Sequence, residues 1–452
     1  MLLIKRNPFN IFQIILWTLK GRSFAKERVT KSVHLFVEQL PYETQLLDYL
    51  REQKEQNKHI FLATTSHHEY AEQVAEHLDI FDDVIATQPE NKSIGDSKLA
   101  AILAATGGAE FAYAGHSSAD RPIWEAASAN ILVNAPSKDV RAAEANKKAA
   151  LVIKSRPPAW RAFVKEMRPH QYAKNALIFV PILTSHGYKE ASVLLAALLA
   201  FICFSLCASG VYFLNDLLDL QSDRLHSSKK NRPLASGNLS LPIGIAGACG
   251  LPVVAFAAAL LFLPTFFVGV LAFYFLMTNA YSFFLKRVST ADVMTLAILY
   301  TLRVVAGAAV TGIALSSWLI AFSVFMFVSL AYLKRYIEIA ALPGNATVAH
   351  GREYSAADSE TMFSLGIANI TASVMIFALY INSEEVIRLY QSPEILWLLC
   401  LLLLYWGNRI WVGARRGKIH DDPIVFAIKD KVSQMVGVVF LIVILTAKYI
   451  EI

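Results

Sequence analysis

The chain contains 452 residues, of which 55% are hydrophobic, and its mean hydropathy of +0.43 excludes a wholly soluble globular protein. Its net charge of +6 does not indicate nucleic-acid binding, because the basic residues lie in loops between apolar runs, as they do in membrane proteins. Residues 1–170 have a soluble composition, whereas apolar runs of membrane-spanning length recur from about residue 172.

The first 150 residues have the alternating pattern of a soluble α/β domain. Apolar runs over residues 59–64, 110–114 and 131–134 predict strands. Three polar residues mark this pattern: Thr64 ends the first strand, Lys98 opens a helix, and Asp120 follows the second strand. The arrangement resembles the haloacid-dehalogenase-like (HAD) phosphatases, whose second, third and fourth motifs these residues match.

The resemblance to HAD phosphatases fails at the residue that carries their chemistry. Their first motif, D-x-D on the opening strand, is absent, since the only aspartate before residue 60 is Asp48, in a helical stretch. His116 follows Gly115, where an aspartate is usual. No phosphoenzyme can form without the nucleophilic aspartate. We therefore expect residues 1–150 to form a HAD-like domain that is catalytically degenerate.

Residues 151–170 are expected to form a basic linker beside the membrane. Pro157 and Pro158 stiffen the chain before the membrane region, and Lys154 and Arg156 lie close to them. These bases either contact anionic membrane lipids or lie on a solvated segment.

Residues 171–452 predict an all-α polytopic membrane domain with about nine transmembrane helices. The expected spans are 172–186, 191–214, 241–263, 265–285, 292–313, 317–336, 361–382, 393–413 and 432–450. The connections after the even-numbered spans contain fifteen Lys and Arg residues, and the others contain two. The positive-inside rule therefore places these connections and the N-terminal domain in the cytoplasm, and we expect a bacterial inner or plasma membrane.

The most polar motif of the chain follows the second of these spans. Asn215, Asp216, Asp219 and Asp223 come directly after an apolar run, where carboxylates are costly unless they function. Their spacing places Asn215, Asp219 and Asp223 on one stripe of a continuous helix. Mg²⁺ binds one or two carboxylates and takes its remaining ligands from water and phosphate. We therefore expect a magnesium-bound diphosphate here, and the alternative is a solvated helix end.

Basic residues suited to phosphate follow the acidic motif. Arg224, Lys229 and Arg232 precede a turn marked by Pro233 and Gly237. Arg232 and Lys229 are candidates to clamp phosphate oxygens, with arginine better suited to bidentate contacts. The alternative is an ordinary positive loop on the cytoplasmic side.

Further candidates lie around the fifth span. Tyr281 and Lys286 stand at the end of the fourth span. Asp292 begins the fifth, either as a second carboxylate centre or as an acid favoured by the helix dipole. Arg303 lies inside that span and requires a partner there, either an anionic lipid head or an internal carboxylate.

Two later segments also carry charge. Lys334 and Arg335 lie at the inner end of the sixth span, close to Glu338. Asp421 and Asp422 are either acid/base or metal-binding groups or caps of the following helix.

Together, these residues resemble the UbiA superfamily of intramembrane prenyltransferases. Asn215, Asp216, Asp219 and Asp223 match its signature N-D-x-x-D-x-x-x-D. The block D-R-x-H-x-x-K-x-x-R-P-x-A-x-G, which begins at Asp223, is similar to the decaprenyl-phosphate phosphoribosyltransferase branch. Aromatic prenyltransferases usually carry a second D-x-x-x-D motif, whereas here Leu296 stands four residues after Asp292.

The resemblance implies a Mg²⁺-dependent enzyme that transfers a 5-phosphoribosyl group from phosphoribosyl diphosphate to a polyprenyl phosphate and releases diphosphate. The implied catalytic residues are Asp216, Asp219, Asp223 and Asp292, and the implied metal ligands are Asn215, Asp219 and Asp223. The implied substrate-binding residues are Arg224, Lys229, Arg232, Tyr281, Lys286, Arg303, Lys334 and Arg335.

Two other functions remain open. The first is an aromatic prenyltransferase of quinone or pigment synthesis, which joins a polyprenyl diphosphate to an aromatic acceptor. The second is a non-enzymatic lipid-binding or transport protein, which is disfavoured because the polar groups cluster at one face rather than at the midplane. The sequence gives no indication of the oligomeric state.

Overall fold

The computed structural model describes residues 3, 10–21, 28–29, 32, 36–86, 94–185, 187–340, 353–419 and 422–451. The chain divides into two units. The first contains Met1–Phe163 and Asp216–Leu241, and the second contains Val164–Asn215 and Pro242–Ile452. A segment from the middle of the chain, which includes most of the acidic motif, is therefore grouped with the N-terminal region.

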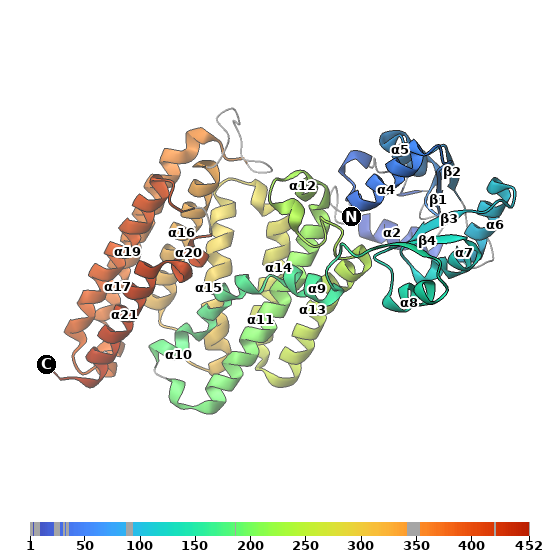
Figure 1. Ribbon diagram of the computed structural model, residues 1–452. Coiled ribbons are helices and arrows are strands. Elements are labelled where there is room, and N and C mark those ends of the chain that lie inside the picture. Colours follow the sequence, from blue (N-terminus) through green and yellow to red (C-terminus); the bar gives the residue numbers. More distant parts are fainter. Residues whose placement is uncertain are drawn as a thin grey trace. The chain divides into compact units, whose positions relative to one another are not determined.

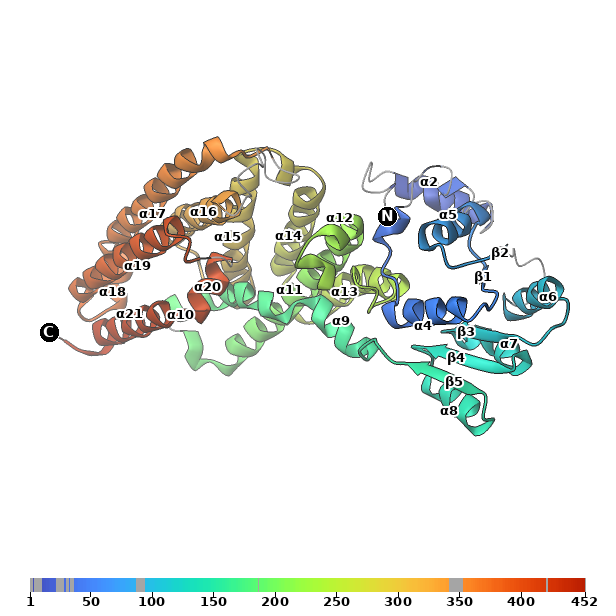
Figure 2. The same cartoon turned by 45° about the horizontal axis from the view of Figure 1, so that its top comes forward.

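The first unit contains two small parallel sheets (Figures 1 and 2). In one sheet β1 (Phe61–Thr64) pairs with β2 (Asp83–Ala86). In the other, β4 (Ala129–Val133) lies between β3 (Ala112–Gly115) and β5 (Ala149–Ile153). Parallel pairing requires a crossover between strands, which helices supply here.

Helices α6 (Ile94–Thr106), α7 (Arg121–Ala126) and α8 (Ser137–Ala145) enclose, with the strands, a small apolar core that contains Ile123, Trp124 and Leu132. The other helices of this unit are α2 (Asn10–Leu19), η1 (Val37–Gln39), α4 (Thr44–Glu55), α5 (His68–Leu78), η2 (Ser118–Asp120), α12 (Leu220–Leu225) and η5 (Lys229–Asn231). Residues 1–150 thus alternate helices and strands, as their pattern predicts, although β2 and β5 had no expected counterpart. The HAD-like arrangement stays a prediction.

Across the described residues, eight helices are long and apolar enough to cross a membrane. They are α11 (Ala191–Leu218), α13 (Leu241–Phe262), α14 (Thr265–Phe283), α15 (Ala291–Thr311), α16 (Ser317–Ala340), α17 (Ser359–Ile381), α19 (Trp397–Arg415) and α21 (Lys431–Tyr449). Large apolar side chains such as Leu260, Leu261 and Phe266 are exposed on them, as a lipid-facing surface requires. The protein is therefore an integral membrane protein.

The prediction of nine spans is wrong at the first one. Residues 172–185 do not form a membrane-spanning helix; they lie in η3 (Pro169–Phe179), a 3₁₀ helix, and in the short α10 (Val180–Thr184) with its C-cap Ser185, and η4 (Gly187–Lys189) comes next among the described elements. Two prolines lack the N–H that a continuous helix needs, Pro169 at the start of η3 and Pro181 at the start of α10. Lys174 and Asn175 are buried within η3 and interrupt its apolar character.

Helix α15 is the centre of the second unit, because 72% of its most apolar 18-residue stretch is buried. It packs against α14, α16, η3 and α10. The contact with η3 depends on Gly307, since a Cβ at this position would overlap the carbonyl of Ile178. The irregular segment therefore lies directly against the most buried helix of the bundle.

The remaining elements of the second unit are short. They are η6 (Leu285–Arg287), η7 (Ala356–Asp358), α18 (Glu384–Leu389), η8 (Pro393–Leu396) and α20 (Pro423–Lys429), while α9 (Ala159–Met167) crosses from the first unit into the second. Helices α14 to α17 and α19 run alternately up and down, so that the C-terminal ends of α14, α16 and α19 lie at one end of this unit (Figure 1). The sequence predicts that the connections after these three helices are basic and cytoplasmic.

Candidate active site

The acidic motif brings two buried carboxylates onto one guanidinium. Nη1 of Arg232 lies 3.0 Å from Oδ1 of Asp216 and 2.5 Å from Oδ2 of Asp223. Both aspartates are only 3% exposed. Burial raises the pKa of Asp223, and the carboxylate of Asp216 raises it further against the opposing effect of Arg232. Two carboxylates therefore share one cation.

The motif does not lie on one continuous helix. Helix α11 ends at Leu218, and Asp219 is the N-cap of α12, with φ −96° and ψ 11°. The predicted stripe of Asn215, Asp219 and Asp223 is therefore interrupted at its middle residue. Asp216 and Asp223, which lie seven residues apart, instead meet at Arg232.

The pair formed by Asp216 and Asp223 fits a hard divalent cation. Mg²⁺ needs one or two protein carboxylates and takes its remaining ligands from water and phosphate. The guanidinium of Arg232 already bridges the two carboxylates, which shows that they can hold a cation between them. Within the described residues, no three His, Cys, Asp or Glu side chains form a larger metal-binding group.

The other predicted phosphate-binding residues of this region lie around the same turn. Nε of Arg224 donates to the carbonyl of Ala235 at 3.2 Å, which fixes the turn. Lys229 is exposed in η5, and Asn215 and Asp219 are half-buried. Lys286, in η6 of the second unit, is also half-buried.

The second predicted acidic centre is engaged with a predicted phosphate ligand. Nε of Arg335 lies 2.5 Å from Oδ2 of Asp292, and its Nη2 donates to Oδ1 at 3.1 Å. Tyr281 bridges the two, because its hydroxyl donates to Asp292 at 2.8 Å and accepts from Nη2 of Arg335 at 2.9 Å. Glu338 accepts a further bond from Nη1 of Arg335. These contacts join the ends of α14, α15 and α16.

Arg303 is buried inside α15. Its Nε donates to Oδ1 of Asn175 at 2.8 Å, its Nη2 lies 3.3 Å from the hydroxyl of Tyr274, and its Nη1 donates to the carbonyl of Leu299. These partners, in the described part of the chain, are all neutral. The guanidinium also lies 5.1–5.6 Å from the ring centroids of Phe204, Tyr274 and Tyr300. Three aromatic rings and neutral hydrogen-bond acceptors therefore surround Arg303, rather than the internal carboxylate that was one of its two expected partners.

Lys334 lies beside a lysine that the sequence did not single out. Nζ of Lys174 and Nζ of Lys334 lie 2.7 Å and 3.2 Å from the same oxygen, Oδ2 of Asp422. The other oxygen of Asp422 accepts from the backbone N–H of Ile424 and caps α20, as one of its two predicted roles requires, while the acid/base or metal-binding role stays a prediction. Asp421 lies outside the described residues.

Two of the three residues that match HAD motifs are in direct contact. Nζ of Lys98 lies 3.0 Å from Oδ1 of Asp120, and Asp120 also accepts from the hydroxyl of Tyr113 and from backbone N–H groups of residues 116 and 117. Thr64 ends β1, and α6, which carries Lys98, packs against this strand.

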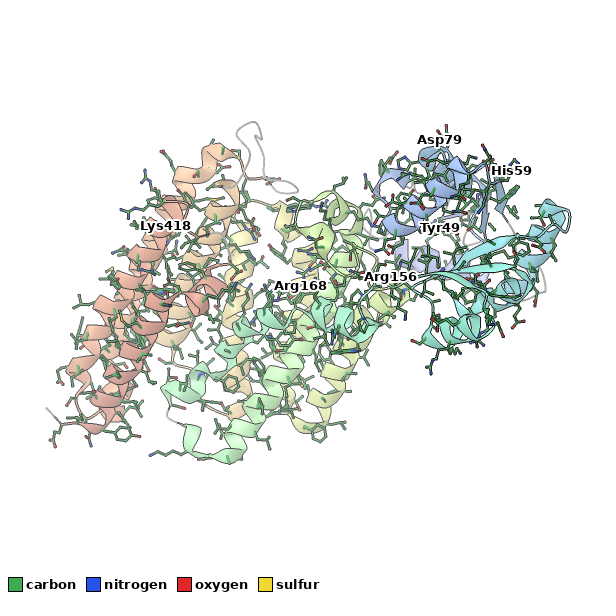
Figure 3. The ribbon with its side chains drawn as sticks, viewed as in Figure 1. Tyr49, His59, Asp79, Arg156, Arg168 and Lys418 are labelled. Atoms are coloured by element: carbon green, nitrogen blue, oxygen red, sulfur yellow. The ribbon has the colours of Figure 1, made fainter. Side chains whose placement is uncertain are left out.

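The residues that sequence reasoning missed lie in η3. Besides Lys174, this segment contributes Tyr172, which bonds to Ser209, and Asn175, which bonds to Ser205 of α11 and to Arg303. The available signal was a lysine next to an asparagine inside an expected membrane span, which by default indicates function. Arg168, where the chain leaves α9 (Figure 3), places its guanidinium 5.3 Å from the ring centroid of Tyr212.

Comparison with known proteins identifies the family. Residues 176–347 match the UbiA prenyltransferase family. The chain is 34% identical over 434 residues to the uncharacterized protein y4nM of Sinorhizobium fredii, covering 95% of this chain and 84% of the relative. It is 33% identical over 193 residues to the decaprenyl-phosphate phosphoribosyltransferase of Mycobacterium tuberculosis, covering 41% of this chain and 64% of that protein.

A similar solved structure is a UbiA homolog from Archaeoglobus fulgidus bound to DMAPP and Mg²⁺, at 14% identity and a TM-score of 0.48, covering 64% of this chain and 99% of that one. From the family match, the chain contains a UbiA prenyltransferase family domain over residues 176–347.

Proposed function

We propose that this protein transfers a 5-phosphoribosyl group from phosphoribosyl diphosphate to a polyprenyl phosphate in the membrane and releases diphosphate. The observation that carries the proposal is the buried pair of Asp216 and Asp223, which shares one guanidinium within the UbiA signature. The similarity to a decaprenyl-phosphate phosphoribosyltransferase supports this choice of donor and acceptor.

The acidic motif is proposed to hold Mg²⁺ through Asn215, Asp219 and Asp223, with Asp216 paired beside Asp223 at Arg232. When bound, Mg²⁺ would neutralise the diphosphate that leaves as the bond between ribose carbon and oxygen breaks. Arg232 is 28% exposed and pairs with Asp216 and Asp223, and it is proposed to exchange these partners for phosphate oxygens. Lys229 and Lys286 are proposed to contact phosphate as further cations.

Asp292, Arg335 and Tyr281 are proposed to form a second group of charged and polar residues. Asp292 is proposed as the second acidic centre, with Arg335 as its counter-ion and Tyr281 fixing both side chains. The active site and the first 150 residues are proposed to face the cytoplasm, since the basic connections of the bundle share one end. We propose that the N-terminal domain is a HAD-like remnant without phosphatase activity, because no nucleophilic aspartate accompanies Lys98 and Asp120.

One assay tests the proposed reaction. The purified full-length protein is incubated with Mg²⁺, labelled phosphoribosyl diphosphate and a polyprenyl phosphate. A parallel reaction contains a polyprenyl diphosphate and labelled 4-hydroxybenzoate. Label that becomes lipid-soluble only in the first reaction is expected. Label that becomes lipid-soluble only in the second would instead identify an aromatic prenyltransferase.

A variant tests whether the acidic motif carries the reaction. Asp219→Asn is expected to abolish transfer while leaving the melting temperature within a few degrees of wild type, because the side chain is half-buried and nearly isosteric. Asp430→Asn is the matched control, because it removes another aspartate that caps a helix. Full activity in Asp219→Asn would remove the acidic motif from the reaction.

A further inference from the structure

The segment η3 is built around buried polar side chains. A 3₁₀ run of 11 residues is unusual, because 3₁₀ helices rarely exceed four residues and longer ones often mark functional segments. Lys174 and Asn175 are 8% and 2% exposed in this run. The chain therefore places a lysine inside the membrane unit on a segment that is not an α-helix.

Two cations of this unit lie over one aromatic ring, and a third shares a carboxylate with one of them. Nζ of Lys174 lies 5.9 Å from the ring centroid of Tyr300, and Cζ of Arg303 lies 5.6 Å from the same centroid. Lys334 joins Lys174 at the carboxylate of Asp422. Among the described residues, Asp422 is the one carboxylate that pairs with this group. The group of Lys174, Arg303, Lys334 and Asp422 therefore carries an excess of two positive charges.

An excess of two positive charges inside a membrane protein is costly without an anion. A phosphate monoester carries a charge of about −1.5 to −2 at neutral pH and offers three acceptor oxygens, which matches this excess. Oδ2 of Asp422 accepts from both lysines, at distances that suit a phosphate oxygen equally well. The carboxylate therefore marks the position that an anionic ligand would occupy.

Asp422 is ionised in this position. Burial alone would raise the pKa of Asp422, but the charges of Lys334 and Lys174 outweigh burial and hold that pKa below its usual range. The carboxylate consequently competes with any other anion for the two ammonium groups.

We propose that Lys174 and Lys334 bind the phosphate monoester of the acceptor lipid and that Asp422 occupies this subsite until the lipid displaces it. The choice of a lipid rests on the proposed function, since the donor also carries a phosphate monoester, on carbon 5 of its ribose. Arg303, held by Asn175 next to Lys174, supplies the remaining positive charge.

Binding measurements on the full-length protein in nanodiscs test this proposal. A short polyprenyl monophosphate is titrated by calorimetry, and phosphoribosyl diphosphate with Mg²⁺ is titrated separately. Lys174→Gln and Lys334→Gln are each expected to weaken the lipid phosphate by roughly tenfold to a hundredfold, because each removes a charge-assisted hydrogen bond. Neither variant is expected to change the affinity for phosphoribosyl diphosphate.

The Asp422→Asn variant is expected to change the affinity for the lipid phosphate in the opposite direction. It removes the competing charge and keeps a helix-capping side chain, so the lipid phosphate is expected to bind several-fold more tightly. Asp430→Asn is the matched control, because Asp430 also caps a helix and pairs with a cation, Arg409, but does not contact the two lysines. The uncharged polyprenol serves as a second control, whose affinity should not change in any variant.

Two results would overturn the assignment. One is Asp422→Asn binding the lipid phosphate no more tightly than wild type. The other is lysine variants that weaken only phosphoribosyl diphosphate, which would give the subsite to the donor. The protein could also bind the lipid phosphate with the expected changes in each variant and yet show no phosphoribosyl transfer. That result would refute the proposed function but not the phosphate subsite.

Discussion

The ion pair of Asp292 and Arg335 predicts a large and specific loss of stability when one partner is removed. Arg335 is 1% exposed and Asp292 is 0% exposed. Replacing Arg335 with Met leaves the carboxylate of Asp292 buried without this counter-ion. Removing one partner of a buried pair typically costs about 3–5 kcal/mol, whereas replacing both partners is often neutral. Arg335→Met is therefore expected to be more damaging than the double variant with Asp292→Asn.

The structure sets the size of this effect. Glu338 is 37% exposed, so water can solvate it after Arg335 is lost, and its share of the cost is small. Asp292 is 0% exposed and cannot be solvated by water in this way, although Tyr281 continues to donate a hydrogen bond to it. We expect the single variant to lose about 3 kcal/mol, near the lower limit, and the two substitutions to be coupled by about 2 kcal/mol. A loss of this size corresponds to a fall in melting temperature of about 5–10 °C.

Buried thiols provide the assay. Cys203, Cys207 and Cys400 are buried, so a thiol-reactive dye reports their exposure on heating, while the exposed Cys249 is removed in a Cys249→Ala background. Arg388→Met is the control, because Arg388 pairs with Glu384 in full exposure and should contribute less than about 1 kcal/mol. A melting temperature for Arg335→Met equal to that of Arg388→Met would refute the reasoning. Restored stability without restored transfer in the double variant would show that the pair of Asp292 and Arg335 also acts in the reaction.

Three further predictions concern single positions. Burial raises the pKa of Asp223 above its ordinary value of 3.8. The protonated side chain therefore contributes stability below pH 3.8, and this stability is lost as the pH rises through the pKa of the folded protein. At pH 7, Asp223→Asn is expected to have a higher melting temperature than wild type and to lose transfer activity. The hydrogen bond from Arg409 lowers the pKa of Asp430 to about 2, so its stabilisation is present above pH 3.8 and lost as pH falls toward 2; Asp430→Asn should cost about 1 kcal/mol at pH 7 and nothing near pH 2, as melting curves at both pH values can show. Gly307→Ala is expected to lower the free energy of unfolding by about 1–3 kcal/mol, because the added Cβ would overlap a backbone carbonyl of η3. A melting temperature equal to that of wild type in the same assay would contradict this packing.

The long helices were predictable because their signal is local. The expected spans 241–263, 265–285 and 432–450 correspond to Leu241–Phe262, Thr265–Phe283 and Lys431–Tyr449 in the structure. A run of about 20 apolar residues must satisfy its backbone hydrogen bonds internally, and an α-helix does so without help from distant residues. Hydropathy alone therefore locates both ends within a few residues.

The first expected span and the pairing of the charged side chains were not predictable in this way. Residues 172–186 meet the apolar criterion only partly, and their conformation depends on Gly307 of α15 and on Asp422, far along the chain. The same limit applies to Asp292 and Arg335, which the sequence nominates separately for metal and phosphate. Sequence spacing indicates which residues are charged inside the membrane but not which of them neutralise each other.

The charge balance of the separate groups agrees with two substrates of different character. Asp216 and Asp223 share one guanidinium and carry an excess of negative charge, which attracts a metal ion bound to diphosphate. Lys174, Lys334 and Arg303 carry an excess of positive charge around Asp422, which attracts an anion without a metal. A phosphoribosyl donor that arrives with Mg²⁺ and a lipid phosphate that arrives alone require these opposite polarities. The basic group of Lys174, Lys334 and Arg303 therefore suits the phosphate acceptor of the proposed phosphoribosyl transfer, and the parallel reaction with 4-hydroxybenzoate distinguishes the two enzymatic functions.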